Sequence, residues 1–181
     1  PTVSQDELSQ LVDHRVSTAE ISMLQAPVMA EEIREVLFSM PSNKAPGPDG
    51  YPMEFYKAAW SVVGKDFVTA VQSFFIYGFM PRSVNATLLA LVPKTADAEK
   101  MTDFRPIACC NVIYKVVSKI IARRLKATLP EAIELNQCAF VEGRLLLENV
   151  LLATELVKDY HKTSVTSRSA IKLDISKAFD T

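Results

Sequence analysis

The sequence predicts a helix-rich α+β fold, and three observations support this class. Apolar residues make up 49% of the 181 residues and only 5 are glycine, which fits a packed core. Apolar side chains recur at helical spacing in several segments. Two other apolar segments, 87–93 and 171–175, have the short length or the alternation typical of β-strands.

The helices follow from the period and from their end signals. The first 25 or so residues are polar and show no clear period, so we expect a linker or an extended lead-in there. Helices are predicted at 30–40, at 53–77 with a break near Gly64, at 112–128 and at 145–161. Asn111 is the expected N-cap of the third of these. Its expected apolar face consists of Ile113, Val117, Ile120 and Ile121.

The strands are predicted from apolar runs. TLLALVP, at 87–93, has the pattern of a buried strand, and a hairpin-like excursion separates it from a short strand at 106–109. At the end of the chain, Ile171, Leu173 and Ile175 alternate with Lys172 and Asp174. This period of two predicts a half-buried strand that presents Asp174 opposite its apolar face.

Charge is unevenly distributed along the chain. The formal net charge is −1, yet residues 1–40 contain seven acidic and two basic residues, whereas residues 100–130 contain seven basic residues and one acidic residue. A local basic surface allows a neutral chain to meet a polyanion. This pattern keeps a nucleic-acid partner open.

Two groups of cations could form that surface. Lys94 and Arg105 flank the excursion after 87–93, so a hairpin would bring both to one edge. A stripe of cations lies opposite the apolar face of the helix at 112–128: Lys115, Lys119, Arg123 and Lys126. Such a stripe is more often a solvated helix face, but the lack of any acid between residues 114 and 130 favours a nucleic-acid backbone.

The loop KAPGPDG, at 44–50, is a strong turn signal. Pro46 and Pro48 fix φ, and Gly47 and Gly50 permit positive φ. The loop lacks the ending of a phosphate-binding P-loop. A rigid surface turn and a substrate contact are therefore equally supported.

Cysteine usage and hydropathy bear on the compartment. Cys109, Cys110 and Cys138 have no zinc-ligand spacing, so reduced thiols and an intracellular location, nuclear or cytoplasmic, are expected. No apolar run reaches 18 residues, so we expect no membrane partner. The oligomeric state is left open.

Several motifs occur together in a fixed order: SNKAPGPDG, LLALVPKT, DFRPIACCNVIYKVVSKIIARRLK, NQCAFVEGRLLLENVLLATEL and IKLDISKAFDT. This order resembles the reverse transcriptase of non-LTR (LINE-type) retrotransposons, most closely those of plants, over residues 31–181. The resemblance implies a right-hand polymerase. Its expected parts are a polar lead-in at 1–29, a helical N-terminal segment at 30–86, fingers at 87–136 and the start of the palm at 137–181.

The resemblance also implies roles for individual residues. Asp174 matches the first metal-binding, catalytic aspartate of the palm, and the carbonyl of Ile175 would be a further metal ligand. Phe179 matches the bulky gate that excludes a ribose 2′-OH. Lys94 and Arg105 match the cations that grip the incoming triphosphate.

The implied partners follow from the same resemblance. Gln137, Gly143 and Arg144 match a segment that lies against the template and the nucleotide pocket. The partners would be an RNA template, a DNA primer and deoxynucleoside triphosphates, with Mg²⁺ as the cofactor of the intact enzyme. Two-metal phosphoryl transfer needs several hard oxygen ligands, and the paired aspartates of the family do not follow Asp174 here. We therefore expect a fragment that is inactive alone.

Two alternatives remain at this point. A group II intron maturase-type reverse transcriptase shares the palm and fingers, but a more basic chain is expected there. A non-catalytic nucleic-acid-binding module, including the remnant of a decayed element, would make no use of Asp174.

Overall fold

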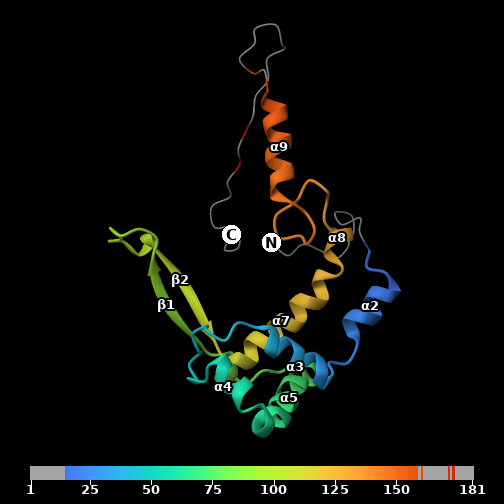
Figure 1. Cartoon of the computed structure of the whole chain (residues 1–181), viewed down its shortest axis with the longest axis vertical. Helices are drawn as coiled ribbons and strands as arrows, with labels where there is room; N and C mark the ends of the chain where they lie inside the picture. The colour runs from blue at the N-terminus through green and yellow to red at the C-terminus, as the bar shows by residue number, and fades with distance from the viewer. Residues whose placement is uncertain (1–14, 159, 161–170, 172, 174–181) are drawn as a thin grey trace, which may run out of the picture. The chain divides into compact units, whose positions relative to one another are not determined.

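The computed structural model describes residues 15–158, 160, 171 and 173, and the chain divides into two units, Pro1–Ala132 and Ile133–Thr181. The described helices of the first unit are α2 (Thr18–Gln25), α3 (Ala30–Ser39), α4 (Met53–Ala58), α5 (Trp60–Tyr77), α6 (Arg82–Asn85), α7 (Val112–Lys126) and α8 (Leu129–Ala132). The strands are β1 (Thr87–Pro93) and β2 (Phe104–Cys110), linked through a 3₁₀ turn at Met101–Asp103. In the second unit the structure describes α9 (Leu146–Val157). The helix-rich α+β class is confirmed (Figure 1).

The core of the first unit lies where α3, α5 and α7 meet. Apolar residues three and four positions apart on each helix face the other two helices, as an amphipathic stripe requires. The largest fully buried side chains come from these three helices: Ile33, Val36, Leu37, Val71, Val112, Val116 and Ile120. The helix predicted at 30–40 is confirmed as α3.

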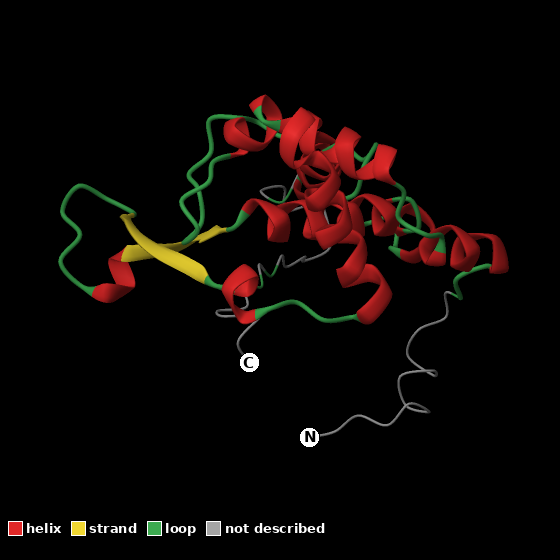
Figure 2. Ribbon diagram, turned by 90° about the horizontal axis from the view of Figure 1, so that it is seen from below, coloured by secondary structure: helices red, strands yellow, loops and turns green. Residues whose placement is uncertain are grey.

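The two strands form an antiparallel ribbon that extends away from the core helices of the first unit, α3, α5 and α7 (Figures 1 and 2). Its register runs from Thr87 opposite Cys110 to Pro93 opposite Phe104, so the predicted bounds of the first strand and the hairpin are confirmed. The expectation that this strand is buried is wrong, because every residue of β1 is exposed, Leu89 to 65%. A two-stranded ribbon that extends from its own unit has no layer on either face to cover its apolar side chains.

The lead-in and the second predicted helix need correction. The extended lead-in is wrong over α2, which Ser17 and Glu20 begin with a capping box. That Ser-x-x-Glu signal was present in the sequence. The break in the second helix lies at Ala59 rather than Gly64, which is buried inside α5. Ala59 closes α4 and starts α5, so no glycine is needed for the break.

Helix α7 is confirmed, but two of its details differ from the prediction. The buried side chains are Val112, Val116, Val117 and Ile120. Ile121 is 38% exposed and Ile113 is partly buried, so the apolar face is rotated relative to the predicted one. Asn111 occupies the N-cap position, but its side chain makes no cap hydrogen bond.

The Asn111 side chain instead joins three segments of the first unit. Its Oδ1 accepts from the backbone N–H of Asp49 at 3.2 Å, and its Nδ2 donates to the carbonyls of Ser83 at 2.9 Å and Val84 at 3.2 Å. The residue is only 2% exposed. These bonds hold the 44–50 loop and α6 against the start of α7. The loop therefore packs tightly at its base, where a Cβ on Gly47 would lie 2.1 Å from Asn111 Oδ1 and 2.6 Å from the carbonyl carbon of Cys110.

We expect Gly47→Ala to lower the free energy of unfolding by about 3 kcal/mol, since the clashing atoms include backbone that cannot move alone. Gly50→Asn in the same loop is the control. Gly50 has a φ of 76° and open space around it, and asparagine adopts that conformation at little cost. Urea unfolding of both variants measures the difference. Equal losses would contradict the tight packing of Gly47.

The described part of the second unit consists of an irregular connector and one helix. The helix predicted at 145–161 is confirmed as α9, but it ends at Val157. Its leucines are exposed, for example Leu151 to 60%. Of the terminal strand predicted at 171–175, the structure describes Ile171 and Leu173, which are not in a strand and are 81% and 85% exposed. The rest of that segment lies outside the described residues.

Two further expectations concern the whole chain. Cys109, Cys110 and Cys138 are free thiols. Among the described residues, no helix combines the length and the apolar content needed to cross a membrane.

Candidate functional site

The cations predicted to come to one edge of a hairpin, Lys94 and Arg105, both lie near the turn end of the β1–β2 ribbon. Arg105 is opposite Val92, and the backbone N–H of Lys94 donates to the carbonyl of Asp103 at 2.8 Å. Cross-strand partners share a face, so Arg105 lies on the face of Val92, and Lys94 follows directly after the end of β1. The opposite face of the ribbon contains Thr87, Leu89, Leu91, Pro93, Phe104, Pro106, Ala108 and Cys110, none of which is charged.

The turn beside this pair is held by its own hydrogen bonds. The Lys94 ammonium donates to the carbonyl of Thr102 at 2.6 Å. The Asp103 carboxylate accepts from the backbone N–H of Lys100 at 3.0 Å and of Glu99 at 3.3 Å. The bond from Lys100 is the main reason that the pKa of Asp103 is lowered.

The pair suits a polyphosphate. Arg105 is exposed and, within the described part of the chain, has no hydrogen-bond acceptor or carboxylate partner. An ammonium supplies a point charge with several donors, and a guanidinium supplies a planar fork that matches phosphate oxygens. Both cation types are suited to phosphate oxygens.

The basic stripe of α7 is partly engaged inside the protein. Lys115 donates to the carbonyl of Ala45 in the 44–50 loop at 2.8 Å. Arg123 forms an exposed ion pair with Glu35 at 2.7 Å, which raises the pKa of the guanidinium. Lys119 is exposed. The stripe therefore combines structural contacts with a cationic surface.

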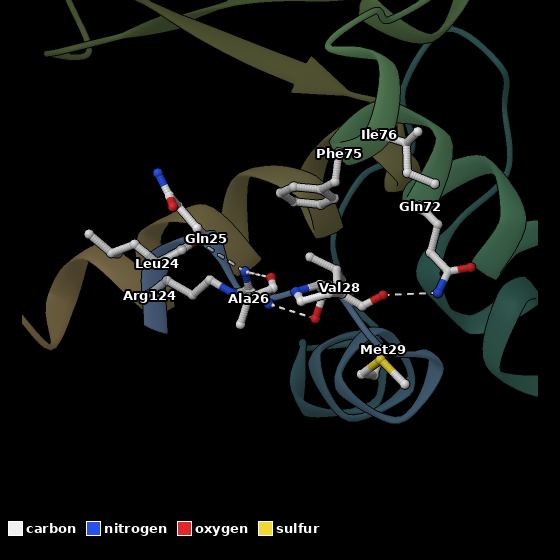
Figure 3. A pocket seen from close by; sticks show the side chains of 10 residues that line it. Leu24, Gln25, Ala26, Val28, Met29, Gln72, Phe75, Ile76 and Arg124 are labelled. Atoms are coloured by element: carbon white, nitrogen blue, oxygen red, sulfur yellow. Dashed lines mark hydrogen bonds between the residues drawn. The ribbon is translucent and has the colours of Figure 1, made fainter. Parts of the chain in front are cut away.

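Arg124, one position away from the stripe, is a structural residue that the sequence pattern did not single out. Its Nε and Nη2 bind both carboxylate oxygens of Glu32, at 3.1 and 2.7 Å, and the side chain is 14% exposed. Its Nη1 donates to the carbonyls of Leu24 and Ala26, and Nη2 also reaches the carbonyl of Pro27. Figure 3 shows Arg124 at a pocket of about 570 Å³ beside this segment. Since its donors are used within the protein, Arg124 fastens α2 and α3 to α7.

In the second unit, Arg144 organises the connector before α9. Its guanidinium donates to the carbonyls of Ile133 at 2.7 Å, Gln137 at 2.8 Å and Glu134. Gly143 has a φ of 80°, so a residue without a Cβ suits the turn. Gln137 donates weakly to the carbonyl of Ala139 at 3.4 Å. These three predicted template-contact residues therefore lie in one connector, and Arg144 fixes its backbone.

The predicted metal and sugar contacts cannot be placed in the same way. Asp174, Ile175 and Phe179 lie outside the described residues. Within residues 15–158, 160, 171 and 173, the structure contains no cluster of three or more His, Cys, Asp or Glu side chains that could hold a metal ion.

Comparison with known proteins adds a family match to this geometry. Residues 92–181 match the family described as "Reverse transcriptase (RNA-dependent DNA polymerase)". The match begins near the end of β1 and includes β2, α7, α8, α9 and the segment with Asp174. It therefore includes Lys94, Arg105, the α7 stripe and the connector braced by Arg144.

Curated relatives extend the similarity over nearly the whole chain. The chain is 34% identical to the "Transposon TX1 uncharacterized 149 kDa protein" of Xenopus laevis over 98% of its residues. It is 27% identical to the "Retrovirus-related Pol polyprotein from type-1 retrotransposable element R2" of Popillia japonica over 86% of its residues. It is also 27% identical to the "Retrovirus-related Pol polyprotein from type-2 retrotransposable element R2DM" of Drosophila melanogaster over 84%. The chain spans 14%, 20% and 14% of these proteins, respectively.

Proposed function

Because this chain belongs to the reverse transcriptase regions of non-LTR retrotransposon proteins, we propose that the protein that carries it copies RNA into DNA. The reaction is the transfer of deoxynucleotides to a DNA primer on an RNA template. The observation that carries the proposal is the family match over residues 92–181, which includes the paired cations of the ribbon. In this proposal Lys94 and Arg105 hold the incoming triphosphate.

The parts of the right-hand polymerase are assigned from the same proposal. The fingers comprise residues 87–136, the palm starts at 137–181, and residues 30–86 form a helical N-terminal segment. In the connector of the second unit, Gln137, Gly143 and Arg144 lie against the template. The motif order further supports a parent element of the plant type.

Reverse transcriptases use divalent metal ions, and we propose that Mg²⁺ is held by the carboxylate of Asp174 and the carbonyl of Ile175. Both are hard oxygen donors, which is the ligand chemistry that Mg²⁺ prefers. When bound, the metal supplies charge stabilisation for phosphoryl transfer. In this proposal Asp174 also orients the reacting groups, and the Phe179 ring limits the space at the sugar of the incoming nucleotide.

The chain is expected to bind single-stranded RNA in a salt-dependent manner through the α7 stripe. If four cations contact phosphates, the log of the affinity falls with the log of the salt concentration at a slope of about −2.8, and at about −1.4 if only two do. Because Lys115 and Arg123 already have partners in the protein, the slope should be shallower than the value for four contacts. Fluorescence anisotropy with a labelled oligonucleotide measures it.

Charge reversal at Lys119 provides the site-specific test of this RNA contact. Lys119→Glu should weaken binding and make the slope shallower, whereas Arg82→Glu on α6 changes the same charge away from the stripe. Equal effects of the two variants would show that α7 is an ordinary solvated helix.

Phe179→Val in the full element protein is expected to admit ribonucleotides while deoxynucleotide incorporation is largely kept. A smaller side chain leaves room for the 2′-OH that the ring excludes. Single-nucleotide incorporation ratios are measured beside a melting curve of the same variant. An unchanged ratio in a folded variant would remove Phe179 from the sugar site.

A further inference from the structure

A groove of about 460 Å³ lies between α3 and α5, in the part of the chain that precedes the family match at residues 92–181. Its lining combines one large aromatic side chain, Trp60, with charged and polar ones: Glu31, Arg34, Lys65, Thr69 and Gln72. The volume falls in the range of sites that hold small molecules. None of these residues has a role in the proposed polymerase chemistry.

The Trp60 indole is a fixed wall of this groove. The ring lies over Gly64, where an added Cβ would be 2.9 Å from Cε2 and 3.0 Å from Cδ2. Phe38 and Phe67 contact the indole in T-shaped geometry, with centroid distances of 5.8 and 6.0 Å. The absence of a Cβ at Gly64 therefore leaves room for the indole, and the contacts with Phe38 and Phe67 restrict its orientation. Trp60 is partly buried and lines the groove, and aromatic rings favour stacked or edge-to-face contacts with one another.

The charges of the groove favour an anion. Arg34 and Lys65 are exposed, and in the part of the chain that the structure describes neither forms an ion pair. The Arg34 guanidinium is stacked over the Phe38 ring, with Cζ 4.8 Å from the centroid, so its orientation is restrained. Glu31 is the one opposing carboxylate of the lining, which leaves a net positive charge.

We propose that this groove binds one nucleotide unit, with the base stacked on Trp60 and the phosphate held by Arg34 and Lys65. Base–aromatic stacking beside cations is how proteins bind single-stranded nucleic acid without reading its sequence. The site goes beyond the proposed polymerase function, because it lies on α3 and α5 and uses none of residues 92–181. The nucleotide can come from an RNA strand or from a free nucleoside triphosphate.

The test uses the fluorescence of Trp60, the single tryptophan of the 181 residues. The chain is titrated with a single-stranded RNA oligonucleotide and, separately, with dATP. Saturable quenching by dATP supports binding of free nucleotides, and quenching by RNA alone supports an RNA strand. Anisotropy of a labelled oligonucleotide follows total RNA binding in parallel. If neither ligand quenches Trp60, the proposal is overturned, whether or not the anisotropy shows RNA bound elsewhere.

Matched variants test whether Arg34 and Lys65 bind the phosphate. Arg34→Gln with Lys65→Gln should weaken the quenching titration by about tenfold and make its salt slope shallower by about 0.7 for each phosphate that is no longer bound. Lys44→Gln with Arg82→Gln removes the same charge from exposed positions outside the groove. Equal effects of the two double variants overturn the proposal. Gly64→Ala, checked for folding by its melting curve, displaces the indole at constant charge and should also weaken quenching.

The experiments distinguish failure of the proposed nucleotide binding in the groove from failure of the proposed polymerase function. RNA binding by anisotropy that persists without Trp60 quenching removes only the groove. Quenching by dATP without RNA-templated synthesis in the full element protein removes only the polymerase proposal.

Discussion

Asn111→Asp is expected to destabilise the first unit by about 3–5 kcal/mol at neutral pH, a large fraction of the stability of an ordinary domain. The substitution keeps the shape of the side chain. It replaces the Nδ2 donor by an oxygen that faces the carbonyls of Ser83 and Val84, and it buries a charge at a position only 2% exposed. Neither carbonyl can then keep its bond, and the charge has no cationic partner among these contacts.

Urea unfolding followed by circular dichroism measures the destabilisation, with Asn85→Asp as the control for the same chemical change at an exposed position. Burial and the facing carbonyls raise the folded-state pKa of the introduced carboxyl above its unfolded value of about 4. The loss of stability is therefore complete at pH values above the folded-state pKa of the carboxyl. It becomes smaller as the pH falls toward the unfolded-state pKa. A variant as stable as the wild type at pH 7 would show that Asn111 does not join these segments.

Asp174→Asn in the full element protein is expected to reduce nucleotide incorporation by about a thousandfold, which corresponds to roughly 4 kcal/mol of transition-state stabilisation. The amide keeps the size of the side chain but removes the negative charge that a divalent metal requires. Primer extension on an RNA template measures the effect. The 181 residues by themselves are expected to give no extension, since two-metal transfer needs further carboxylates beside Asp174.

Asp66→Asn is the matched control, because Asp66 is an exposed carboxylate on α5. It should leave the extension rate unchanged. Similar rates for the wild type and the Asp174 variant would place the metal site elsewhere.

The local features of the fold were predictable because they depend on nearby residues. The apolar period of α3, the bounds of β1 and the hairpin all follow from short-range patterns. The exposure of β1 could not be predicted from its apolar sequence, because burial of a strand depends on what covers it. In the part of the chain that the structure describes, nothing covers the apolar residues of β1, and all of them are exposed. The α2 helix was not predicted, because its apolar pattern is weak, although its Ser17–Glu20 capping box was present in the sequence.

The long-range contacts could not be predicted in this way. The Asn111 side chain binds backbone groups 27, 28 and 62 positions away, and Arg124 binds a glutamate 92 positions away. A helical period says which face of α7 is polar, but it cannot say which polar residue bridges to another segment. Arg123 and Arg124 are neighbours in sequence, yet one pairs on the surface and the other is mostly buried.

The same distinction between local patterns and long-range contacts applies to the candidate site. The hairpin places Lys94 and Arg105 near the same end of the ribbon, because the turn fixes the register of its strands. Their grip on a triphosphate stays a prediction, as do the roles of Gln137, Gly143 and Arg144. The roles of Asp174, Ile175 and Phe179 rest on the motif resemblance and on the family match that includes them.

The most direct test of the central claim is primer extension by the full element protein on an RNA template of defined sequence, with the order of incorporated nucleotides read out. The account predicts that deoxynucleotides are added in the order complementary to the RNA, that a divalent metal ion is required, and that Lys94→Ala with Arg105→Ala raises the deoxynucleotide concentration needed for half-maximal rate. Incorporation that ignores the template sequence, or no incorporation by a folded protein supplied with metal, primer and RNA, would contradict it.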